Sequence, residues 1–225
     1  MGNTRPLVVM LHGLFTPSTV MRPFARFFEN QGYEVANYGY RTRTIKLDNI
    51  INDLIVLTAN REMVHFIGHS LGGLLIRHYF DRTKSKTPGV VITLGTPHQG
   101  SVIAKKIKHS RLVSVLGNAG QHGLFPTPQK TWAHPQPLFC VSGVLPLGIA
   151  ILFNLKQREP NDGTVLLSES RLDGCISNPH FCVSHTSMIY AKKIQKYALT
   201  QCQQYEKAHR SLLGDVALQA GDCTA

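Results

Sequence analysis

Residues 64–73, VHFIGHSLGG, decide the fold of this chain. A run rich in residues that favour β-strands leads into Ser70, which has glycine at positions 68, 72 and 73. A strand that turns sharply into a helix leaves little room at the turn, and small residues two positions before and after it avoid clashes. The pattern therefore predicts a strand over 64–69, a helix over 71–82, and an exposed serine hydroxyl between them.

This pattern is a nucleophile elbow, G-x-S-x-G, in which the strained turn aims the serine hydroxyl out of the sheet edge. The motif alone is weak, because short glycine patterns occur by chance and an idle serine in a tight turn fits them equally well. The apolar strand before Ser70 and the helix after it are the context that the motif requires. We therefore predict Ser70 as a nucleophile.

A serine nucleophile needs a base, and the chain offers 11 histidines. His185, in VSHTSM, follows the last expected strand and precedes the last helix, which places it at the same sheet edge as Ser70. His180 is the rival, although it lies in a loop beside a proline. For any other single histidine a structural role is the better interpretation.

The acid that orients the base should lie between the nucleophile and the histidine along the chain. Asp162, in EPNDGTV, satisfies this order, although NDG is also an ordinary turn sequence. Its nearby competitors are Glu159, Glu169 and Asp173.

The developing oxyanion needs backbone N–H donors. We expect one from Leu71, directly after the nucleophile, and the other from Leu14, in the loop LHGLFTPS after the first strand. The residues that we expect to line the substrate site are His12, Phe15, His69, His98, Leu145, Leu147 and Ile149.

Apolar runs that favour strands alternate with helical patterns along the chain, which predicts a mostly parallel sheet of about six strands with helices on both faces. Ser18 is the expected N-cap of a helix that ends near Asn30, and Asp48 that of the next helix. A long final helix is expected over 187–207. The expected strands cover 7–11, 33–40, 64–69, 90–95 and 138–143, with a weak sixth that ends at 182–185.

The segment 97–136 interrupts this alternation, and we interpret it as a lid-like insertion in one domain that covers residues 1–208. It opens with a basic amphipathic helix over 101–116, whose cations are Lys105, Lys106, Lys108 and Arg111. Residues 209–225 are expected to form a flexible tail.

Composition bounds the class of protein. The 225 residues carry 24 Lys and Arg against 13 Asp and Glu, a formal net charge of +11, which favours anionic partners or simply a solvated basic surface.

The five cysteines show no metal-type spacing, and we interpret them as reduced thiols of a cytoplasmic protein; a Cys175–Cys182 bridge is the less favoured alternative. Residues 137–155 approach the length of a membrane span, but Pro146 between two glycines argues against one.

Taken together, the motifs LHGL, GHSLGG, LGTPHQGS, PNDGTV and SHT resemble those of the lipase and esterase branch of the α/β-hydrolase fold, which includes short bacterial lipases. The resemblance spans about residues 7–205 and implies the same roles for Ser70, Asp162, His185, Leu14 and Leu71. Larger members of the family begin with two further strands, for which this chain has no room, so we expect a minimal version of the fold. The carboxylate pair that holds calcium in some relatives is not evident, and we predict no metal and no cofactor.

These residues predict a serine carboxylic-ester hydrolase that acts through an acyl-enzyme on lipid or medium-chain acyl esters. One alternative is an esterase or thioesterase whose acyl chain is carried by an acidic protein. A lower-ranked alternative is a non-catalytic binding module, which should have a broken triad. The basic face could also hold the protein peripherally at an anionic membrane, whereas the sequence offers no nucleic-acid recognition motif.

Overall fold

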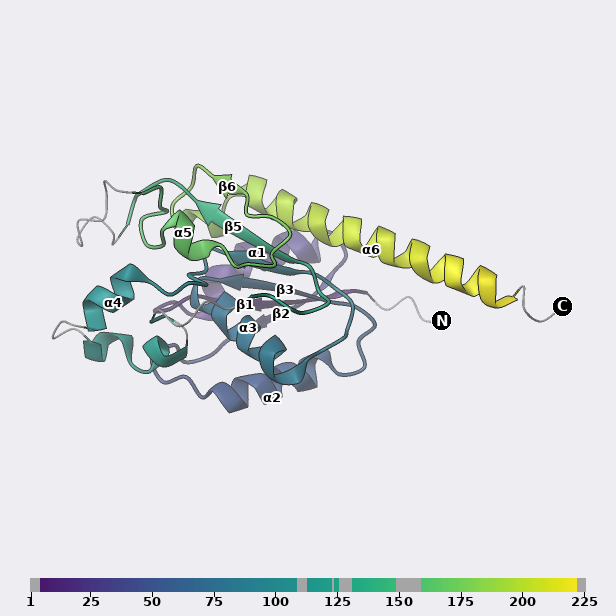
Figure 1. The fold of residues 1–225 in the computed structure, drawn as a ribbon, viewed down its shortest axis with the longest axis horizontal. Coiled ribbons are helices and arrows are strands. Elements are labelled where there is room, and N and C mark those ends of the chain that lie inside the picture. Colours follow the sequence, from purple (N-terminus) through teal and green to yellow (C-terminus); the bar gives the residue numbers. More distant parts are fainter. Residues whose placement is uncertain (1–4, 109–112, 123, 126–130, 149–158, 222–225) are drawn as a thin grey trace.

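The structure, a computed structural model, describes residues 5–108, 113–122, 124–125, 131–148 and 159–221. Within this part of the chain, six strands form one sheet in the order β2-β1-β3-β4-β5-β6, and every neighbouring pair is parallel (Figure 1). This confirms the predicted α/β architecture. The strands are β1 (Leu7–Leu11), β2 (Glu34–Tyr38), β3 (Val64–His69), β4 (Val91–Leu94), β5 (Leu138–Gly143) and β6 (His180–Phe181).

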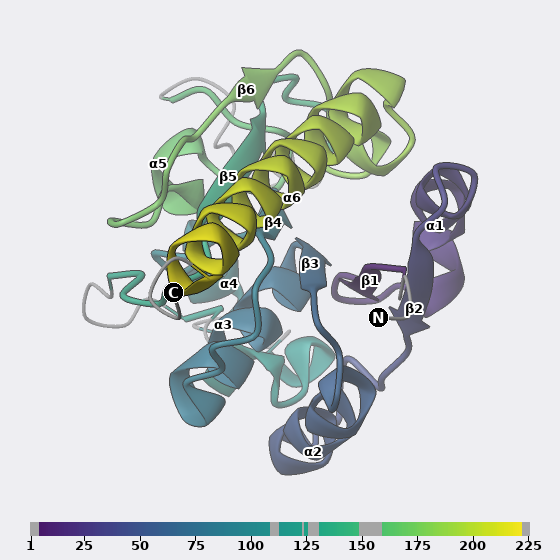
Figure 2. The same cartoon turned by 90° about the vertical axis from the view of Figure 1, so that its right-hand side faces the viewer.

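Helices cover both faces of the sheet, as Figure 2 shows in a view along the strands. On one face lie α1 (Arg22–Glu29) and α6 (Lys192–Gly221), and on the other α2 (Leu47–Thr58) and α3 (Leu71–Thr83). Two hydrophobic cores therefore flank the sheet. A strand between two cores must be apolar at successive positions, which explains the continuous apolar runs in the sequence.

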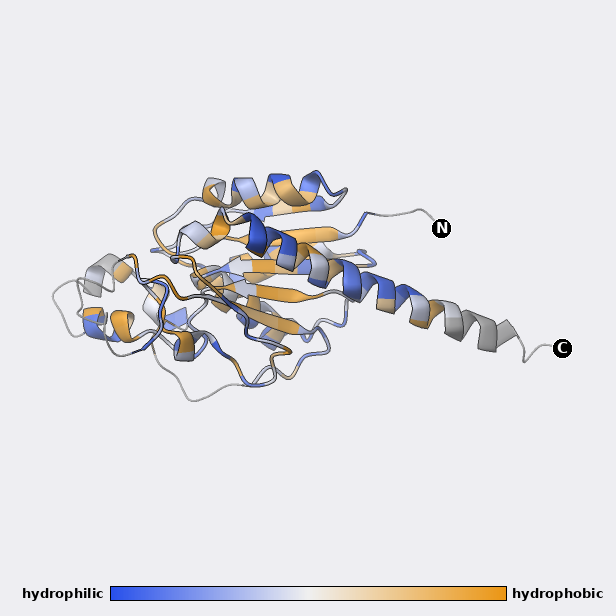
Figure 3. Ribbon diagram, turned by 90° about the horizontal axis from the view of Figure 1, so that it is seen from above, coloured by the Kyte–Doolittle hydropathy of each residue, from blue (hydrophilic) through white to orange (hydrophobic). Residues whose placement is uncertain are grey.

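The first strand illustrates this double burial. Leu7, Val9 and Leu11 pack in the core that α2 and α3 share, whereas Val8 and Met10 pack in the core of α1 and α6. All five residues are buried, and Figure 3 shows much of the sheet in the hydrophobic colour.

Both predicted N-caps are wrong. Ser18 begins a short 3-10 turn, Ser18–Met21, and α1 starts only after Met21, where a proline in its first turn fixes the helical backbone. Lys46 occupies the N-cap position of α2. Asp48 instead lies in the first turn, where the helix dipole favours a carboxylate, and forms an ion pair with Arg82.

The end of the chain also differs from expectation. The sixth strand stops at Phe181 instead of continuing to residues 182–185, because the Val183 N–H turns back to donate to the Phe181 carbonyl. Ser187–Ile189 is a 3-10 turn, and α6 begins only at Lys192. The helix is described past His209 to Gly221 and projects beyond the sheet (Figure 1). The flexibility expected for residues 209–225 stays a prediction.

The insertion between β4 and β5 contains the short helix α4 (Val102–Lys108) and two 3-10 turns, Val113–Leu116 and Ala119–His122. Of the basic helix expected over 101–116, α4 covers 102–108 and a 3-10 turn covers 113–116, whereas residues 109–112 lie outside the described ranges. Asn118 fastens the insertion to the body, since its side chain accepts from the Ile45 N–H (2.7 Å) and donates to the Ile45 carbonyl (2.8 Å). A lid function for this segment remains a prediction.

None of the described helices combines the length and the apolar character that a membrane crossing needs. The four cysteines in the described ranges, Cys140, Cys175, Cys182 and Cys202, are free thiols.

Candidate active site

Ser70 stands at a strained corner between β3 and α3. Its φ of 54° and ψ of −120° are unusual for a residue with a side chain. The flanking glycines are required by space: a Cβ on Gly68 would lie 2.5 Å from the Gly73 nitrogen, and one on Gly72 would lie 2.3 Å from the Leu11 carbonyl oxygen. The corner therefore has the shape that the sequence motif predicts, with the serine at the carboxyl end of β3.

Asp162 and His185 meet at the same edge of the sheet. The His185 Nδ1 lies 2.7 Å from Asp162 Oδ2, while Asp162 Oδ1 accepts hydrogen bonds from the N–H groups of Thr164 (2.9 Å) and Val165 (2.7 Å). These two bonds fix the carboxylate and leave its second oxygen for the imidazole. Because a carboxylate only accepts, Nδ1 carries the proton, and Nε2 remains as the basic nitrogen.

Among the four carboxylates considered from the sequence, all of them within the described ranges, only Asp162 forms a hydrogen bond with His185. The rival base, His180, belongs to β6. The carboxylates of Glu159 and Glu169 bond to backbone N–H groups elsewhere, and the backbone carbonyl of Asp173 accepts from the Trp132 N–H.

His185 lies against His69, the residue next to Ser70, with the two ring centroids 4.7 Å apart. The described residues include no hydrogen bond between Ser70 and His185. In unliganded enzymes this contact is often long and tightens only with substrate. Gly95, directly after β4, has a φ of 55° and leaves space for the carboxylate of Asp162. A Cβ on Gly95 would lie 2.9 Å from Asp162 Oδ2.

Two backbone donors flank the serine. Within the described residues the Leu14 N–H has no hydrogen-bond partner, and Leu71, as the first residue of α3, has no acceptor within its own helix. The loop that carries Leu14 lies against Ser70, since a Cβ on Gly13 would be 3.1 Å from Ser70 Cβ. Two free donors beside one hydroxyl can hold a developing negative charge.

His12, predicted to line the site, instead supports this loop. It is fully buried, its Nδ1–H donates to the Gly13 carbonyl (3.0 Å), and its Nε2 accepts from the Tyr40 N–H (3.2 Å). The Tyr40 ring stacks on the imidazole at 4.3 Å. Burial lowers the pKa of His12, so the ring stays neutral and its two nitrogens are used by the backbone.

His98 is buried in the same way. Its Nε2 lies 3.0 Å from Thr93 Oγ1, and its carbonyl accepts from the buried Arg77 guanidinium (2.9 Å). Burial, followed by the nearby Arg77 charge, lowers the pKa of His98 to about 3. The histidine therefore stabilises the loop after β4.

The apolar candidates are placed differently. Phe15 and Leu147 are exposed, at 54% and 60%, and Leu145 is half-buried. The loop of Leu145 and Leu147 touches the Asp162 loop, since a Cβ on Gly163 would lie 2.4 Å from the Leu147 carbonyl oxygen. Ile149 lies outside the described residues.

Two residues have supporting roles that the sequence did not predict: Thr96, and Glu169, which was considered only as an alternative acid. Thr96 donates its hydroxyl to the Ser70 carbonyl (2.9 Å), and it occupies the space beside Gly73 that a Cβ would need. Glu169 is buried and accepts from the N–H groups of Val102 (2.5 Å) and Leu166 (2.9 Å), thereby joining α4 to the Asp162 loop. The motif LGTPHQGS contains Thr96, but only the fold brings it beneath the serine.

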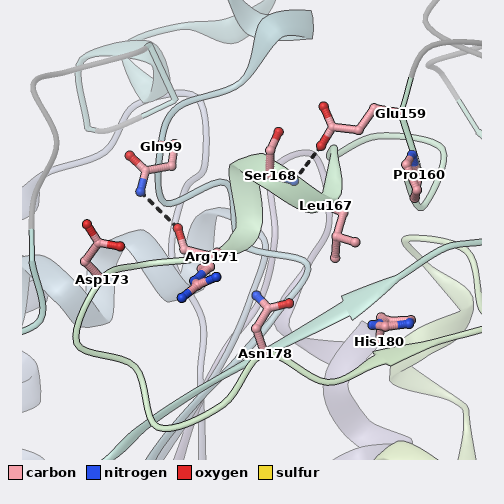
Figure 4. A pocket seen from close by; sticks show the side chains of 9 residues that line it. All are labelled: Gln99, Glu159, Pro160, Leu167, Ser168, Arg171, Asp173, Asn178 and His180. Carbon is pink, nitrogen blue, oxygen red and sulfur yellow. Dashed lines mark hydrogen bonds between the residues drawn. The ribbon is translucent and has the colours of Figure 1, made fainter.

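A large hollow of about 830 Å³ lies next to α5 (Leu167–Ser170), at the β6 edge of the sheet (Figure 4). Its lining includes Arg171, Asn178 and His180, but not Ser70, Asp162 or His185. It is therefore distinct from the corner described above. In the described part of the chain, no group of three or more His, Cys, Asp or Glu is placed to hold a metal ion.

The parallel sheet, with a strained serine at the end of its third strand, defines an α/β-hydrolase. Within that class, the chain belongs to the palmitoyl protein thioesterase family, whose family model matches residues 7–131, more than half of the chain. It is accordingly a hydrolase of the group that contains esterases, lipases and thioesterases. No curated protein sequence matches the chain.

Solved structures agree with the fold. A lipase from Bacillus licheniformis in its mature form superimposes with a TM-score of 0.62 at 20% identity, over 83% of this chain and 87% of the lipase. The type II thioesterase BorB from the borrelidin biosynthetic cluster gives 0.57 at 16% identity, over 89% and 93%. A methylesterase from Arabidopsis gives 0.56 at 14% identity, over 87% and 98%. At these identities the likeness concerns the fold alone.

Proposed function

We propose that this protein is a serine acyl hydrolase, in which Ser70 is the nucleophile, His185 the base and Asp162 the orienting acid. The observation that carries the proposal is the 2.7 Å bond between Asp162 and His185 at the sheet edge where the strained Ser70 stands. An imidazole that is oriented by a fixed carboxylate and lies at the same sheet edge as a serine is the arrangement that activates a hydroxyl. The sequence predicts an exposed Ser70 hydroxyl, whereas the residue is 8% exposed in the structure.

In the proposed reaction, His185 Nε2 takes the proton of Ser70 as the oxygen attacks the acyl carbonyl carbon. The N–H groups of Leu14 and Leu71 hold the resulting oxyanion. The protonated imidazole then donates its proton to the leaving group, and the acyl-enzyme forms. Water activated by His185 attacks the acyl-enzyme, releases the acid and restores Ser70.

The favoured substrates are lipid or medium-chain acyl esters. Phe15 and Leu147 expose apolar side chains on the two loops next to the candidate site, and Leu145 lies beside Leu147. An acyl chain gains about 0.8 kcal/mol for each CH₂ that such a surface removes from water. Activity should therefore rise with chain length until the apolar surface is filled.

A second candidate is a thioester of an acyl chain carried by a protein. The description of the matching family model, palmitoyl protein thioesterase, favours it. The net charge of +11 and the exposed lysines of α4 would attract an acidic carrier. This reading predicts that activity on carrier-bound substrate falls steeply as salt increases, because exposed charges are screened.

A fluorophosphonate probe tests the catalytic proposal directly. The wild type should be labelled, and Ser70→Ala should abolish both labelling and hydrolysis of p-nitrophenyl butyrate. The matched control is Ser211→Ala, which removes the hydroxyl of an exposed serine on α6 and should leave labelling unchanged. A wild type that stays unlabelled while related esterases react would favour a binding module with a hydrolase fold.

Oxygen esters and thioesters of equal chain length separate the two substrates. The measurement is kcat/KM over a p-nitrophenyl ester series and the matching S-acyl thioesters, each with and without anionic vesicles. A preference for thioesters on an acidic carrier, lost in high salt, would favour the second candidate. Flat salt dependence with that carrier would contradict it.

A further inference from the structure

Beyond the three residues of the proposed triad, we infer that His69 is a positioning residue, whose side chain holds the His185 loop in place beside Ser70 and the Leu14 loop. The inference rests on the proposed function, because it assigns a role in that reaction. It concerns the residue between Gly68 and Ser70, which the elbow motif leaves unspecified.

The first contact of His69 is with His185. His69 is the last residue of β3 and only 3% exposed, and its Nε2 lies 2.9 Å from the His185 carbonyl oxygen. Because a carbonyl only accepts, Nε2 carries the proton and donates it. The two rings also lie against each other, with centroids 4.7 Å apart and planes inclined by 46°.

This bond completes the fixation of the His185 backbone. The His185 N–H donates to the Asp162 carbonyl (2.7 Å), and the His185 carbonyl accepts from His69. Both polar backbone groups of the base are therefore occupied, each by a residue that adjoins or belongs to the proposed triad. The His185 backbone therefore cannot move away from the sheet edge without breaking one of these two hydrogen bonds.

The opposite edge of the His69 ring faces the Leu14 loop. A Cβ on Gly13 would lie 2.8 Å from His69 Nδ1 and 3.1 Å from Ser70 Cβ. The imidazole thus fills the space between the loop that supplies an oxyanion donor and the loop that supplies the base. It fixes their separation as well as their orientation.

The charge of His69 suits this place. Burial is the main cause that lowers the pKa of His69 to about 3, and the neighbouring His185 adds to it. The His69 ring is therefore neutral at any pH well above 3. A second cation here would oppose the imidazolium that forms on His185 during attack, whereas a neutral donor supports the geometry without that repulsion.

Two substitutions distinguish the effect of the hydrogen-bond donor of His69 from the effect of the size of its ring. His69→Leu keeps an apolar side chain of similar reach and removes the donor, whereas His69→Gln can place an amide N–H where Nε2 now lies. With p-nitrophenyl butyrate, His69→Leu should lower kcat about 100-fold with KM changed less than about twofold, since a misplacement of about 1 Å costs that much. His69→Gln should recover most of the loss.

The matched control is His65→Leu, at the start of the same strand. His65 is fully buried and bonds to Glu206 at 3.2 Å, away from the candidate site. This variant should lower the melting temperature yet leave kcat within about twofold, measured well below that temperature. The control distinguishes an effect of lower overall stability from an effect of a displaced His185 loop.

If His69→Leu does not fold, His69→Gln and His69→Asn provide the comparison. The shorter asparagine amide ends near the Nδ1 position and should not reach the His185 carbonyl. The kcat of His69→Asn should therefore be well below that of His69→Gln. The inference is overturned if leucine retains kcat within about threefold, or if glutamine is as slow as asparagine. Absence of fluorophosphonate labelling in the wild type would instead contradict the proposed function.

Discussion

Single residues at the β3–α3 corner show how tightly the backbone constrains the candidate site. Ser70 holds a positive φ, and the glycines around it leave no room for a methyl group. Thr96 and Asp162 complete the surroundings through hydrogen bonds to backbone groups of the same region. Small changes at these positions should therefore act on both stability and activity.

Gly72→Ala should destabilise the fold by about 3 kcal/mol, because the new Cβ would lie 2.3 Å from the Leu11 carbonyl oxygen and 2.7 Å from that of His12. The displaced backbone leads into the Leu14 loop, so hydrolysis should fall as well. Urea unfolding measures the first effect. The control is Gly214→Ala on α6, where an added Cβ would meet nothing within 4 Å apart from the adjoining residues and the backbone of its own helix. This variant should be neutral or slightly stabilising, and equal losses in both variants would refute the steric argument.

Asp162→Asn should lower kcat about 10³- to 10⁴-fold while the protein stays folded, since an amide in place of Oδ2 favours the wrong tautomer of His185. Steady-state kinetics on a p-nitrophenyl ester measures the loss. Glu159→Gln provides the comparison, because Glu159 bonds to the Ser168 N–H and not to His185. A loss of similar size in that variant would argue against Asp162 as the orienting acid.

Elements contribute by bringing their ends to one edge of the sheet. The loops after β1, β3, β5 and β6 supply Leu14, Ser70, Asp162 and His185, because parallel strands end at the same edge. Glu169, on α5, links two of these regions: its carboxyl group binds the first N–H of α4 and the Leu166 N–H. Its protonation therefore bears on how the insertion joins the Asp162 loop.

Burial raises the pKa of Glu169 to about 7, although the two N–H donors act in the opposite direction. In the native state this carboxyl group thus binds a proton up to about pH 7, whereas in the unfolded chain it loses the proton near its ordinary pKa of about 4.5. Its contribution to stability should therefore decrease as the pH rises through that window.

The test compares Glu169→Gln with the wild type in urea unfolding at about pH 5 and pH 8. The free energy of unfolding of the variant, relative to the wild type, should rise by about 2 kcal/mol between these conditions, since only the wild type loses the proton. Glu29→Gln, at an exposed position of α1, should show no such change. A pH-independent difference for Glu169→Gln would contradict the raised pKa.

The molecule as a whole depends on how α6 is attached to the sheet. At the end remote from Ser70, Glu206 of α6 accepts from the Tyr33 hydroxyl (2.6 Å) and lies 3.2 Å from His65 Nε2. Burial acts to raise the pKa of Glu206, but the hydrogen bonds from His65 and Tyr33 outweigh it and leave the pKa below its ordinary value. This cluster ties the last helix to β3 and to the segment before β2.

Tyr33→Phe should cost about 2 kcal/mol of unfolding free energy, because it removes a donor from a buried carboxylate. The loss should be measurable by urea unfolding, with activity unchanged well below the transition. Tyr205→Phe, next to Glu206 on α6, removes the hydroxyl of a half-buried side chain that forms no hydrogen bond to the described residues, and it should cost little. Equal costs would show that the Glu206 contact does not stabilise the attachment of α6.

Local sequence was sufficient for much of the fold. The strands at 7–11, 64–69 and 138–143 match their predicted bounds, because a strand buried on both faces is continuously apolar and its ends coincide with glycine, proline or polar residues. Helix starts were less predictable: Ser18 and Asp48 are good capping residues, but the packing of α1 and α2 on the sheet decides where each helix begins.

The sequence alone determined the parallel α/β architecture and the serine corner, since both follow from short-range patterns of apolar residues and glycines. Only the tertiary structure decided which of four carboxylates meets His185, that His12 and His98 support loops, and that His69 lies between the base and the Leu14 loop. The physical reason is that these contacts join residues far apart in the chain. Their distances depend on how the sheet brings strand ends together, which no local pattern specifies.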